Sequence, residues 1–358
     1  MRRDREPAMI RFAQYPTYQV FLSVVIAMVA AALLFPLWIR LLQVRNIGQQ
    51  VRADGPQGHL VKQGTPTMGG VLILLVVSAT FLLMGTPTRL SMLALFTMLA
   101  CGVLGFIDDW SKVSHERSLG LRPRAKLFWQ GVVSVVFGLL VVNWAQLPTW
   151  VQIPLTATKV DLGQISTILP IGGFAIVVPW LYLAFVWVMV TGMSNAVNLT
   201  DGLDGLAAGT VTIVTLAYGA IAFRQNSLET ALLAAAVAGA CIGFLWYNSY
   251  PADIFMGDTG SLGLGALIAA LAVITKTELL LLVIGGIYVA ETLSVILQVA
   301  SFKMTGKRIF RMAPVHHHFE MKGWSETKVM VRFWIITGIL AGLGFAMYFV
   351  GTVVGKAR

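Results

Sequence analysis

Long, uninterrupted apolar segments restrict the fold of this chain more than any other feature of its sequence. Backbone groups in lipid must be bonded within helices or closed barrels, and the apolar residues here do not alternate at period two, so helices are favoured. A helix needs about 20 apolar residues to cross roughly 30 Å of hydrocarbon. We therefore predict an all-α polytopic membrane protein of about ten transmembrane helices, in a single domain over residues 1–358. The predicted spans are 18–42, 68–84, 90–107, 127–145, 174–190, 206–223, 228–247, 259–274, 279–302 and 329–354.

The balance of residue types excludes a water-soluble fold. Hydrophobic residues make up 57% of the chain and charged residues 12%, which leaves too little polar surface to cover a soluble domain. The formal net charge is +10, but the cations flank apolar spans, which suits anionic lipid headgroups and phosphorylated substrates better than nucleic acid. We therefore expect membrane lipid, and no nucleic acid, as a partner.

The distribution of Lys and Arg predicts which face of the protein is cytoplasmic, because cytoplasmic loops collect these residues. The predicted cytoplasmic loops are 43–67, 108–126, 191–205, 248–258 and 303–328. Internal loops on the opposite face carry only Arg89, Lys159, Arg224 and Lys276. The N-terminal tail, 1–17, would lie on that opposite face and is itself basic, so it runs against the assignment that the loops favour.

Acidic residues concentrate on the predicted cytoplasmic face, several of them at the ends of spans. They are Asp54, Asp108, Asp109, Asp201, Asp204, Asp253 and Asp258. A carboxylate costs up to about 2.5 to 3.5 kcal/mol at the centre of a bilayer and less near its surface, so repeated placement there indicates a function. Metal binding is the function that this pattern favours.

Two adjacent carboxylates, Asp108 and Asp109, close the third predicted span. Like charges this close do not both ionise readily unless something positive neutralises them. Lys112 lies four residues after Asp108 and three after Asp109, so a continuing helix would bring its ammonium group to both. Mg²⁺, which prefers a few carboxylates together with phosphate oxygens, would have the same effect. A solvated helix end with an ion pair is the alternative.

Two further polar, glycine-containing segments carry candidate ligands. The first is 195–206, in which Asp201 and Asp204 would share a face if helical; an ordinary helix cap is the alternative. The second, 255–261, opens the eighth span, where Asp258 and Thr259 suit capping and a helix N-terminus suits phosphate. A related segment, 64–70, follows Lys62 and opens the second span.

The last predicted loop combines cations with three consecutive histidines. On an extended backbone, His316 and His318 would point to one side and His317 to the other, an arrangement unlike the spaced ligands of zinc sites. An anion- or sugar-binding role is favoured over a solvated basic loop. In the preceding span, Glu291 and Gln298 lie one heptad apart; they form either a polar groove or an internal hydrogen-bonded pair.

The Asp108–Asp109 pair and the segments 195–204, 255–261 and 311–320 closely resemble, in order and spacing, the motifs of the phospho-N-acetylmuramoyl-pentapeptide transferases. These belong to the polyprenyl-phosphate N-acetylhexosamine-1-phosphate transferases. The resemblance implies transfer of phospho-N-acetylmuramoyl-pentapeptide from its UDP carrier to undecaprenyl phosphate, giving lipid I and UMP in peptidoglycan biosynthesis. It also implies Mg²⁺, a bacterial inner membrane, an active site facing the cytoplasm, and a homodimer.

The same resemblance assigns roles to residues of this chain. Asp108, Asp109 and Asp258 would form the catalytic acidic group, with Asp258 the Mg²⁺ ligand and Asp109 and Asp201 as further candidates. Asp204 and the backbone near Leu203 would recognise uracil. The implied substrate-binding residues are Lys62, Lys112, Lys126, Asn198, Asp201, Leu203, Asp204, Asn248, Phe255, His316, His317 and His318. Of these, Phe255 would stack on the base and the histidines would contact the sugar-phosphate side.

A lipid phosphate is already anionic near neutral pH, so the expected reaction is its direct attack on the β-phosphorus, with Asp108 accepting any remaining proton. A covalent phospho-aspartate is the rival route. Two other functions remain open. A sister enzyme that uses UDP-N-acetylglucosamine would share the fold and the aspartates, whereas a membrane transporter would place its polar residues near the midplane.

Overall fold

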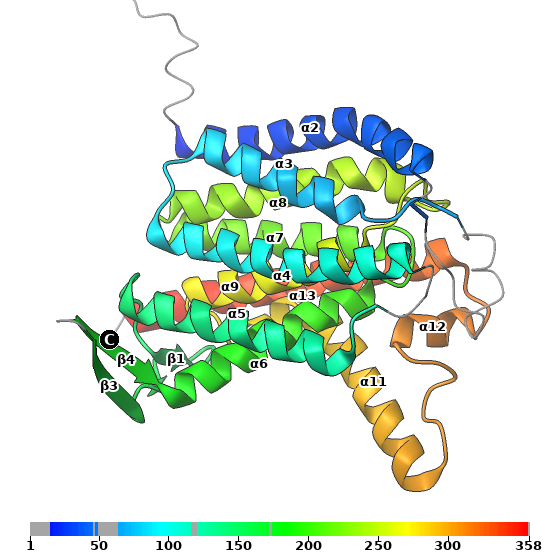
Figure 1. The fold of residues 1–358 in the computed structure, drawn as a ribbon. Coiled ribbons are helices and arrows are strands. Elements are labelled where there is room, and N and C mark those ends of the chain that lie inside the picture. The colour runs from blue at the N-terminus through cyan, green and yellow to red at the C-terminus, as the bar shows by residue number, and fades with distance from the viewer. Residues whose placement is uncertain (1–14, 46, 49–63, 116–119, 172–173, 357–358) are drawn as a thin grey trace, which may run out of the picture.

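A computed structural model of the chain describes residues 15–45, 47–48, 64–115, 120–171 and 174–356 (Figure 1). Lys62 and most of the N-terminal tail lie outside the described residues. The helices are α2 (Pro16–Val44), α3 (Gly69–Met84), α4 (Arg89–Ser114), α5 (Pro123–Asn143), α6 (Trp180–Thr200), α7 (Leu206–Arg224), α8 (Leu228–Asn248), α9 (Gly257–Ile274), α10 (Leu281–Ile284), α11 (Gly286–Thr305), α12 (Val315–Glu320) and α13 (Glu326–Lys356).

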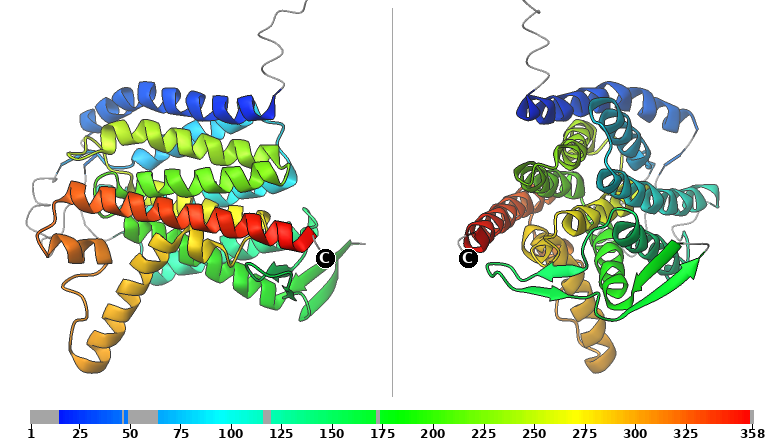
Figure 2. Two further views of the ribbon diagram at one scale, coloured as in Figure 1. Left: turned by 180° about the vertical axis from the view of Figure 1, so that it is seen from behind. Right: turned by 90° about the vertical axis from the view of Figure 1, so that its left-hand side faces the viewer.

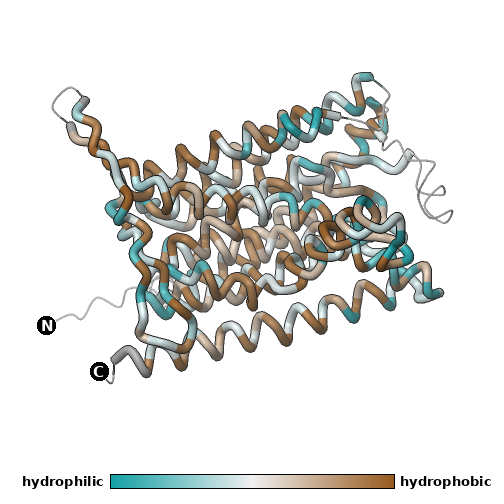
Figure 3. Tube along the Cα trace, turned by 90° about the horizontal axis from the view of Figure 1, so that it is seen from below, coloured by the Kyte–Doolittle hydropathy of each residue, from teal (hydrophilic) through white to brown (hydrophobic). Residues whose placement is uncertain are grey.

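The prediction of an all-α polytopic membrane protein is confirmed. Within the described ranges, nine helices are long and apolar enough to cross a membrane, and α3, with 16 residues, occupies the second predicted span. Figure 3 shows hydrophobic residues along the middle of the bundle and hydrophilic ones gathered toward its ends. The ninth predicted span is divided at Gly285 into the short α10 and the longer α11, and α11 projects away from the bundle (Figures 1 and 2).

Helix α9 forms the centre of the bundle. Every residue from Thr259 to Ile274 is buried, and the helix packs against α3, α4 and α6. Small residues permit this close packing, as in other membrane helix pairs. Gly105 of α4, for example, lies so near the backbone carbonyl of Asp258 that a Cβ there would overlap it. The start of α9 is therefore held in a fixed position by its neighbours.

Four short strands were not expected from the sequence. They form two antiparallel hairpins, β1 (Trp150–Gln152) with β2 (Lys159–Asp161) and β3 (Ser166–Ile171) with β4 (Phe174–Pro179). The predicted fifth span was therefore wrong at its start, because 174–179 belong to β4. Pro179 immediately precedes the first residue of α6.

The hairpins lie at one end of the bundle and the polar motifs at the other (Figure 1). Strand β4 leads directly into α6, whose 21 residues span about 30 Å at 1.5 Å per residue. Asn198 lies near the far end of this helix. Residues 191–200 thus continue α6 instead of forming the first part of a loop.

Candidate active site

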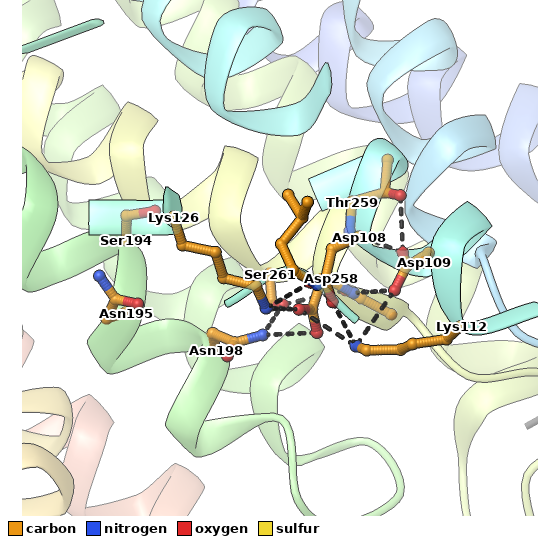
Figure 4. A network of polar contacts seen from close by, with 12 residues as sticks. Asp108, Asp109, Lys112, Lys126, Ser194, Asn195, Asn198, Asp258, Thr259 and Ser261 are labelled. Atoms are coloured by element: carbon orange, nitrogen blue, oxygen red, sulfur yellow. Dashed lines mark hydrogen bonds and ion pairs between the residues drawn. The ribbon is translucent and has the colours of Figure 1, made fainter. Parts of the chain in front are cut away.

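Ends of four helices bring the predicted acidic residues together. Asp108, Asp109 and Lys112 lie on α4, which continues past the predicted span end to Ser114. Asn198 lies on α6 and Asp258 in the first turn of α9. Figure 4 shows the side chains converging, with Lys126 from α5 reaching the same point. The prediction that Lys112 reaches both carboxylates of α4 is confirmed, at 2.6 Å from Asp108 and 3.7 Å from Asp109.

Asp109 anchors the start of α9. Its Oδ1 accepts from the backbone amide of Asp258 at 3.0 Å, and its Oδ2 accepts from the amide and the hydroxyl of Thr259 at 2.9 and 2.7 Å. The expectation that residues of the segment 255–261 cap their own helix was wrong, because no side chain at the N-cap position caps α9. The carboxylate from α4 satisfies these first amides and complements the positive end of the helix dipole.

Asp108 is completely buried and surrounded by donors. Its Oδ1 accepts from the backbone amide of Leu121 at 2.6 Å and lies 3.0 Å from Lys126 Nζ. A Cβ at Gly120 would overlap this carboxylate, so only glycine leaves room for the approach of that loop. Two ammonium groups and one amide therefore surround this buried carboxylate.

Asp258 is the most accessible of the three carboxylates, with 14% of its side chain exposed against none for Asp108 and 4% for Asp109. Its Oδ2 lies 2.6 Å from Lys126 Nζ and 3.2 Å from Lys112 Nζ. Its Oδ1 accepts from Asn198 Nδ2 at 3.0 Å, and the same amide group contacts the Ser261 hydroxyl at 2.9 Å. Asn198 therefore fixes the direction in which Asp258 presents its oxygens.

The carboxylates of Asp108, Asp109 and Asp258 suit a hard divalent cation. One oxygen from each lies within 4.8 Å of the others, which makes them a group of acidic residues, among those described, able to hold one ion. Carboxylate oxygens are the ligands that Mg²⁺ prefers. Asp201 lies outside this group of close oxygens. Burial, reinforced by the charges of Asp258, Asp109 and Asp204, raises the pKa of Asp201 to about 8.

The residues expected near the nucleoside meet at the loop between α6 and α7. This loop is a series of turns rather than a helix, so Asp201 and Asp204 do not share a helical face. Asp204 Oδ2 accepts from the Ala252 amide at 3.0 Å, and Asn248 accepts from the Gly205 amide at 3.0 Å while donating to Ile254 O at 2.9 Å. Both buried side chains therefore tie the 201–205 loop to residues 252–254.

Phe255 and Leu203, also expected near the nucleoside, lie in or next to these two segments. The Phe255 amide donates to Pro66 O at 2.8 Å, and the Gly69 amide donates to Phe255 O at 2.9 Å, so two predicted motifs pair through their backbones. Leu203 is buried and the Phe255 side chain is half-buried. Recognition of uracil by these residues stays a prediction, as does the role of Lys62.

The three histidines lie on the short helix α12, so the expected extended arrangement was wrong. His316 is fully buried and its Nδ1 lies 3.0 Å from Glu291 Oε1 on α11. His317 Nδ1 lies 2.6 Å from Glu320 Oε2, and His318 Nδ1 accepts from the Arg311 amide at 3.0 Å. The ring Nε2 of His316 is directed at Gly202, which places this histidine against the 201–205 loop.

Glu291 and Gln298 do not pair with one another. Glu291 contacts His316, whereas Gln298 accepts from the Ile309 and Phe310 amides, each at 3.0 Å, and donates to Phe310 O at 3.0 Å. Glu291 therefore holds α12 against α11, and Gln298 holds the segment between the two helices. The hydrogen-bonded pair that the sequence left open is therefore excluded.

Comparisons with known proteins identify the family. Residues 91–276 match glycosyl transferase family 4, and residues 62–74 match the phospho-N-acetylmuramoyl-pentapeptide-transferase signature 1. Proteins of that name from Bacillus pumilus, Halalkalibacterium halodurans and Rubrobacter xylanophilus are 45%, 47% and 45% identical to this chain. The alignments cover 91%, 92% and 93% of this chain and 96%, 95% and 98% of those relatives. This chain belongs to the phospho-N-acetylmuramoyl-pentapeptide-transferase family.

Several residues that build this transferase-family site were not singled out from the sequence. Gln130 of α5 accepts from Asn195 at 2.8 Å and donates to Ser194 at 3.0 Å, which joins α5 to α6 behind the carboxylates. Glu326 accepts from the Asp204 amide at 2.9 Å and joins α13 to the 201–205 loop. The only signal for Gln130 was an amide side chain within an apolar span, and Glu326 resembled any charged residue at a helix start.

Proposed function

We propose that this chain transfers phospho-N-acetylmuramoyl-pentapeptide from its UDP carrier to undecaprenyl phosphate, giving lipid I and UMP in peptidoglycan biosynthesis. The observation that carries the proposal is the cluster of three carboxylates and two lysines at one end of a membrane-spanning bundle. A water-soluble nucleotide and the headgroup of a lipid can both reach such a position. The names of the relatives, at 45% to 47% identity over most of the chain, support the same reaction.

We further propose that the cluster faces the cytoplasm, in the inner membrane of a bacterium, and that the enzyme acts as a homodimer. The predicted loops at the end of the bundle that holds the cluster carry most of the Lys and Arg residues, as cytoplasmic loops do. The UDP-linked donor is soluble and would meet the enzyme on that side. The homodimer rests on the family resemblance alone.

Magnesium is the proposed cofactor, with Asp258 as its principal ligand. Asp258 is the most exposed carboxylate of the cluster, and Asp109 already uses both oxygens to hold the start of α9. Asp108 and Asp109 would then contribute negative charge and, as the oxygens allow, further ligands. When bound, Mg²⁺ would neutralise charge on the donor pyrophosphate.

Lys112 and Lys126 are the proposed phosphate ligands of the site. Lys112 and Lys126 neutralise Asp108 and Asp258, and their side chains are 30% and 19% exposed, so we propose that they contact phosphate oxygens of the donor. An oxygen of the lipid phosphate would bond to the β-phosphorus while the bond from that phosphorus to the bridging oxygen breaks. The electron pair leaves with UMP, and Asp108 would accept any proton still carried by the nucleophile.

Donor choice is the direct test. Purified protein in detergent is given polyprenyl phosphate and either UDP-N-acetylmuramoyl-pentapeptide or UDP-N-acetylglucosamine, and lipid product and UMP are measured. We expect product with the muramoyl donor, loss of turnover on chelation, and recovery with Mg²⁺. Asp258→Asn should reduce turnover at least 100-fold, whereas Arg89→Gln, at the opposite end of the bundle, should not. Product from the glucosamine donor alone would assign the sister activity.

A second experiment separates direct transfer from a covalent phospho-aspartate. Labelled UMP is incubated with the unlabelled donor and enzyme without any lipid phosphate. Direct attack predicts no exchange of label into the donor, since the reverse step needs the lipid product. Exchange in lipid-free enzyme that disappears in Asp258→Asn would establish the covalent route.

A further inference from the structure

A cavity of about 290 Å³ lies at the opposite end of the bundle from the carboxylate cluster. Its lining residues come from β1 and the turn after it, the end of α7, the connection from α9 to α10, and the C-terminal part of α13. Figures 1 and 2 show the hairpins and the C-terminal end of α13 at this end of the bundle. Polar groups from Trp150, Gln152, Gln225, Lys276 and Thr352 line it, and Leu155, Leu280 and Met347 supply apolar walls. The lining thus combines apolar surface with a cation.

Lys276 is the charged group of the cavity wall. Only 11% of its side chain is exposed, and its ammonium group lies 2.6 Å from Glu278 Oε1 and 3.2 Å from Pro148 O. Glu278 is fully buried and its second oxygen has no hydrogen-bond partner among the described residues. Burial lowers the pKa of Lys276 and raises the pKa of Glu278, so the pair stabilises its own charges poorly. A further anion beside Lys276 would stabilise the charged lysine.

Two more cations are connected to the cavity wall, one through a ring contact and one through its neighbour in the chain. Lys159 Nζ lies 4.0 Å from the centre of the Trp150 ring. Lys276 Nζ lies 5.0 Å from the centre of the same ring. The Arg224 guanidinium, next to the cavity residue Gln225, lies 4.4 Å from the centre of the Phe349 ring. These aromatic contacts orient the cations without neutralising them.

The cations at this end of the bundle are not spread evenly over its loops. The internal loops at this end carry four cationic residues. Lys276 lines the cavity, Lys159 contacts the lining residue Trp150, and Arg224 precedes the lining residue Gln225 in the chain. The fourth, Arg89, instead donates to Trp144 O at 2.8 Å. Glu278 is paired with Lys276, whereas Asp161 Oδ1 accepts from Thr149 and from the Gly163 amide at 2.6 and 2.8 Å. Among the described residues, Lys159 and Arg224 therefore form ring contacts but no ion pair.

We propose that this cavity binds the headgroup of an anionic phospholipid from the leaflet at that end of the bundle. Its phosphate would lie among Lys276, Lys159 and Arg224, and the apolar walls would contact the start of the acyl chains. A basic site edged by aromatic rings at the end of membrane helices has the chemistry for an anionic headgroup. This inference does not depend on the proposed transferase activity.

The test uses the purified full-length chain in detergent and counts bound lipid by native mass spectrometry. The probes are phosphatidylglycerol, phosphatidylcholine and glycerol phosphate. We expect phosphatidylglycerol to bind at least fivefold more tightly than phosphatidylcholine. Binding of phosphatidylglycerol should weaken about fivefold for each cation removed in Lys159→Gln and Arg224→Gln. Arg89→Gln, a cation of the same face outside the cavity, is the matched control and should leave binding unchanged.

Each other outcome overturns the proposal. Equal binding of the two lipids would make the cavity a merely apolar site. Equal weakening by Arg89→Gln would reduce the effect to general surface charge, and glycerol phosphate binding as tightly as the lipid would identify a site for a free phosphate ester. The variant Lys276→Gln with Glu278→Gln removes both buried charges together; it should also lose the preference for phosphatidylglycerol, and its melting curve reports whether it is folded.

Discussion

The Asp109 carboxylate on α4 accepts hydrogen bonds from both the amide and the hydroxyl of Thr259 in the first turn of α9, at 2.9 and 2.7 Å. These residues are 150 positions apart in the chain. The contact fixes the position of Asp258, the neighbour of Thr259 and the most accessible carboxylate of the cluster. Asp109 therefore serves the site by holding the helix that carries Asp258, in addition to any role as a ligand.

Replacing Asp109 by Asn should destabilise the protein and reduce turnover together. The amide retains one acceptor but turns an NH₂ group toward donors of α9, which costs about 1–3 kcal/mol. We expect a lower melting temperature in detergent and at least tenfold slower transfer. Thr259→Val, which keeps the backbone bond, should cost about 0.5–1.5 kcal/mol. Additive effects in the double variant would contradict a direct interaction.

Asn198 should control the cation requirement more than stability. Asn198→Ala removes the bond that orients Asp258 Oδ1, and partners of metal-binding carboxylates typically change affinity or activity by about 10- to 100-fold. We expect a higher Mg²⁺ concentration for half-maximal transfer with little change in melting temperature. Ser261→Ala leaves the Asn198–Asp258 bond in place and should have a smaller effect. An unchanged Mg²⁺ requirement in Asn198→Ala would contradict this role.

The membrane-spanning helices could be predicted because each is a long apolar segment, but the hairpins could not. Residues 174–179 are apolar and precede α6, and a short apolar run does not distinguish a strand from the start of a helix. Their pairing with 166–171 depends on a partner strand that local sequence does not reveal.

Within the site, contacts along one helix were predictable and contacts between distant elements were not. The approach of Lys112 to Asp108 and Asp109 follows from helical spacing of four and three residues. The bond from the Leu121 amide to Asp108 does not, because every residue except proline carries the same backbone amide. Gly120 is required there only because the folded loop brings its Cα against the carboxylate.

Glu291 should act as a positioning residue through His316. Glu291→Ala would leave the buried imidazole nitrogen without its partner, and losing such a hydrogen bond costs about 1–3 kcal/mol. Because His316 packs against the 201–205 loop, we expect a raised KM for the nucleotide donor as well as lower stability. Glu291→Gln keeps an acceptor for the imidazole and should recover most of the activity. Equal behaviour of the two variants would contradict positioning by this bond.

Asp201 should make the metal-free protein pH-sensitive. Its pKa in the folded chain is raised from 3.8 to about 8, chiefly by burial and then by the neighbouring Asp258 charge. The folded state therefore binds a proton that the unfolded chain has released, and stability should fall as pH rises through the window from about 4 to 8. Melting temperatures measured across this range in the presence of a chelator would record the decline.

The control for this pH dependence is Asp201→Asn, which removes the titrating group and should flatten the profile over the same range. Infrared spectroscopy of the metal-free protein should show a protonated carboxyl band that disappears near pH 8 and is absent in Asp201→Asn. A divalent cation held by the carboxylate cluster would offset the negative charges that raise this pKa, so Mg²⁺ should move the transition to lower pH. A band that titrates near pH 4 in the metal-free protein would show that Asp201 is well solvated, and the site would then lack the buried negative potential that attracts a cation.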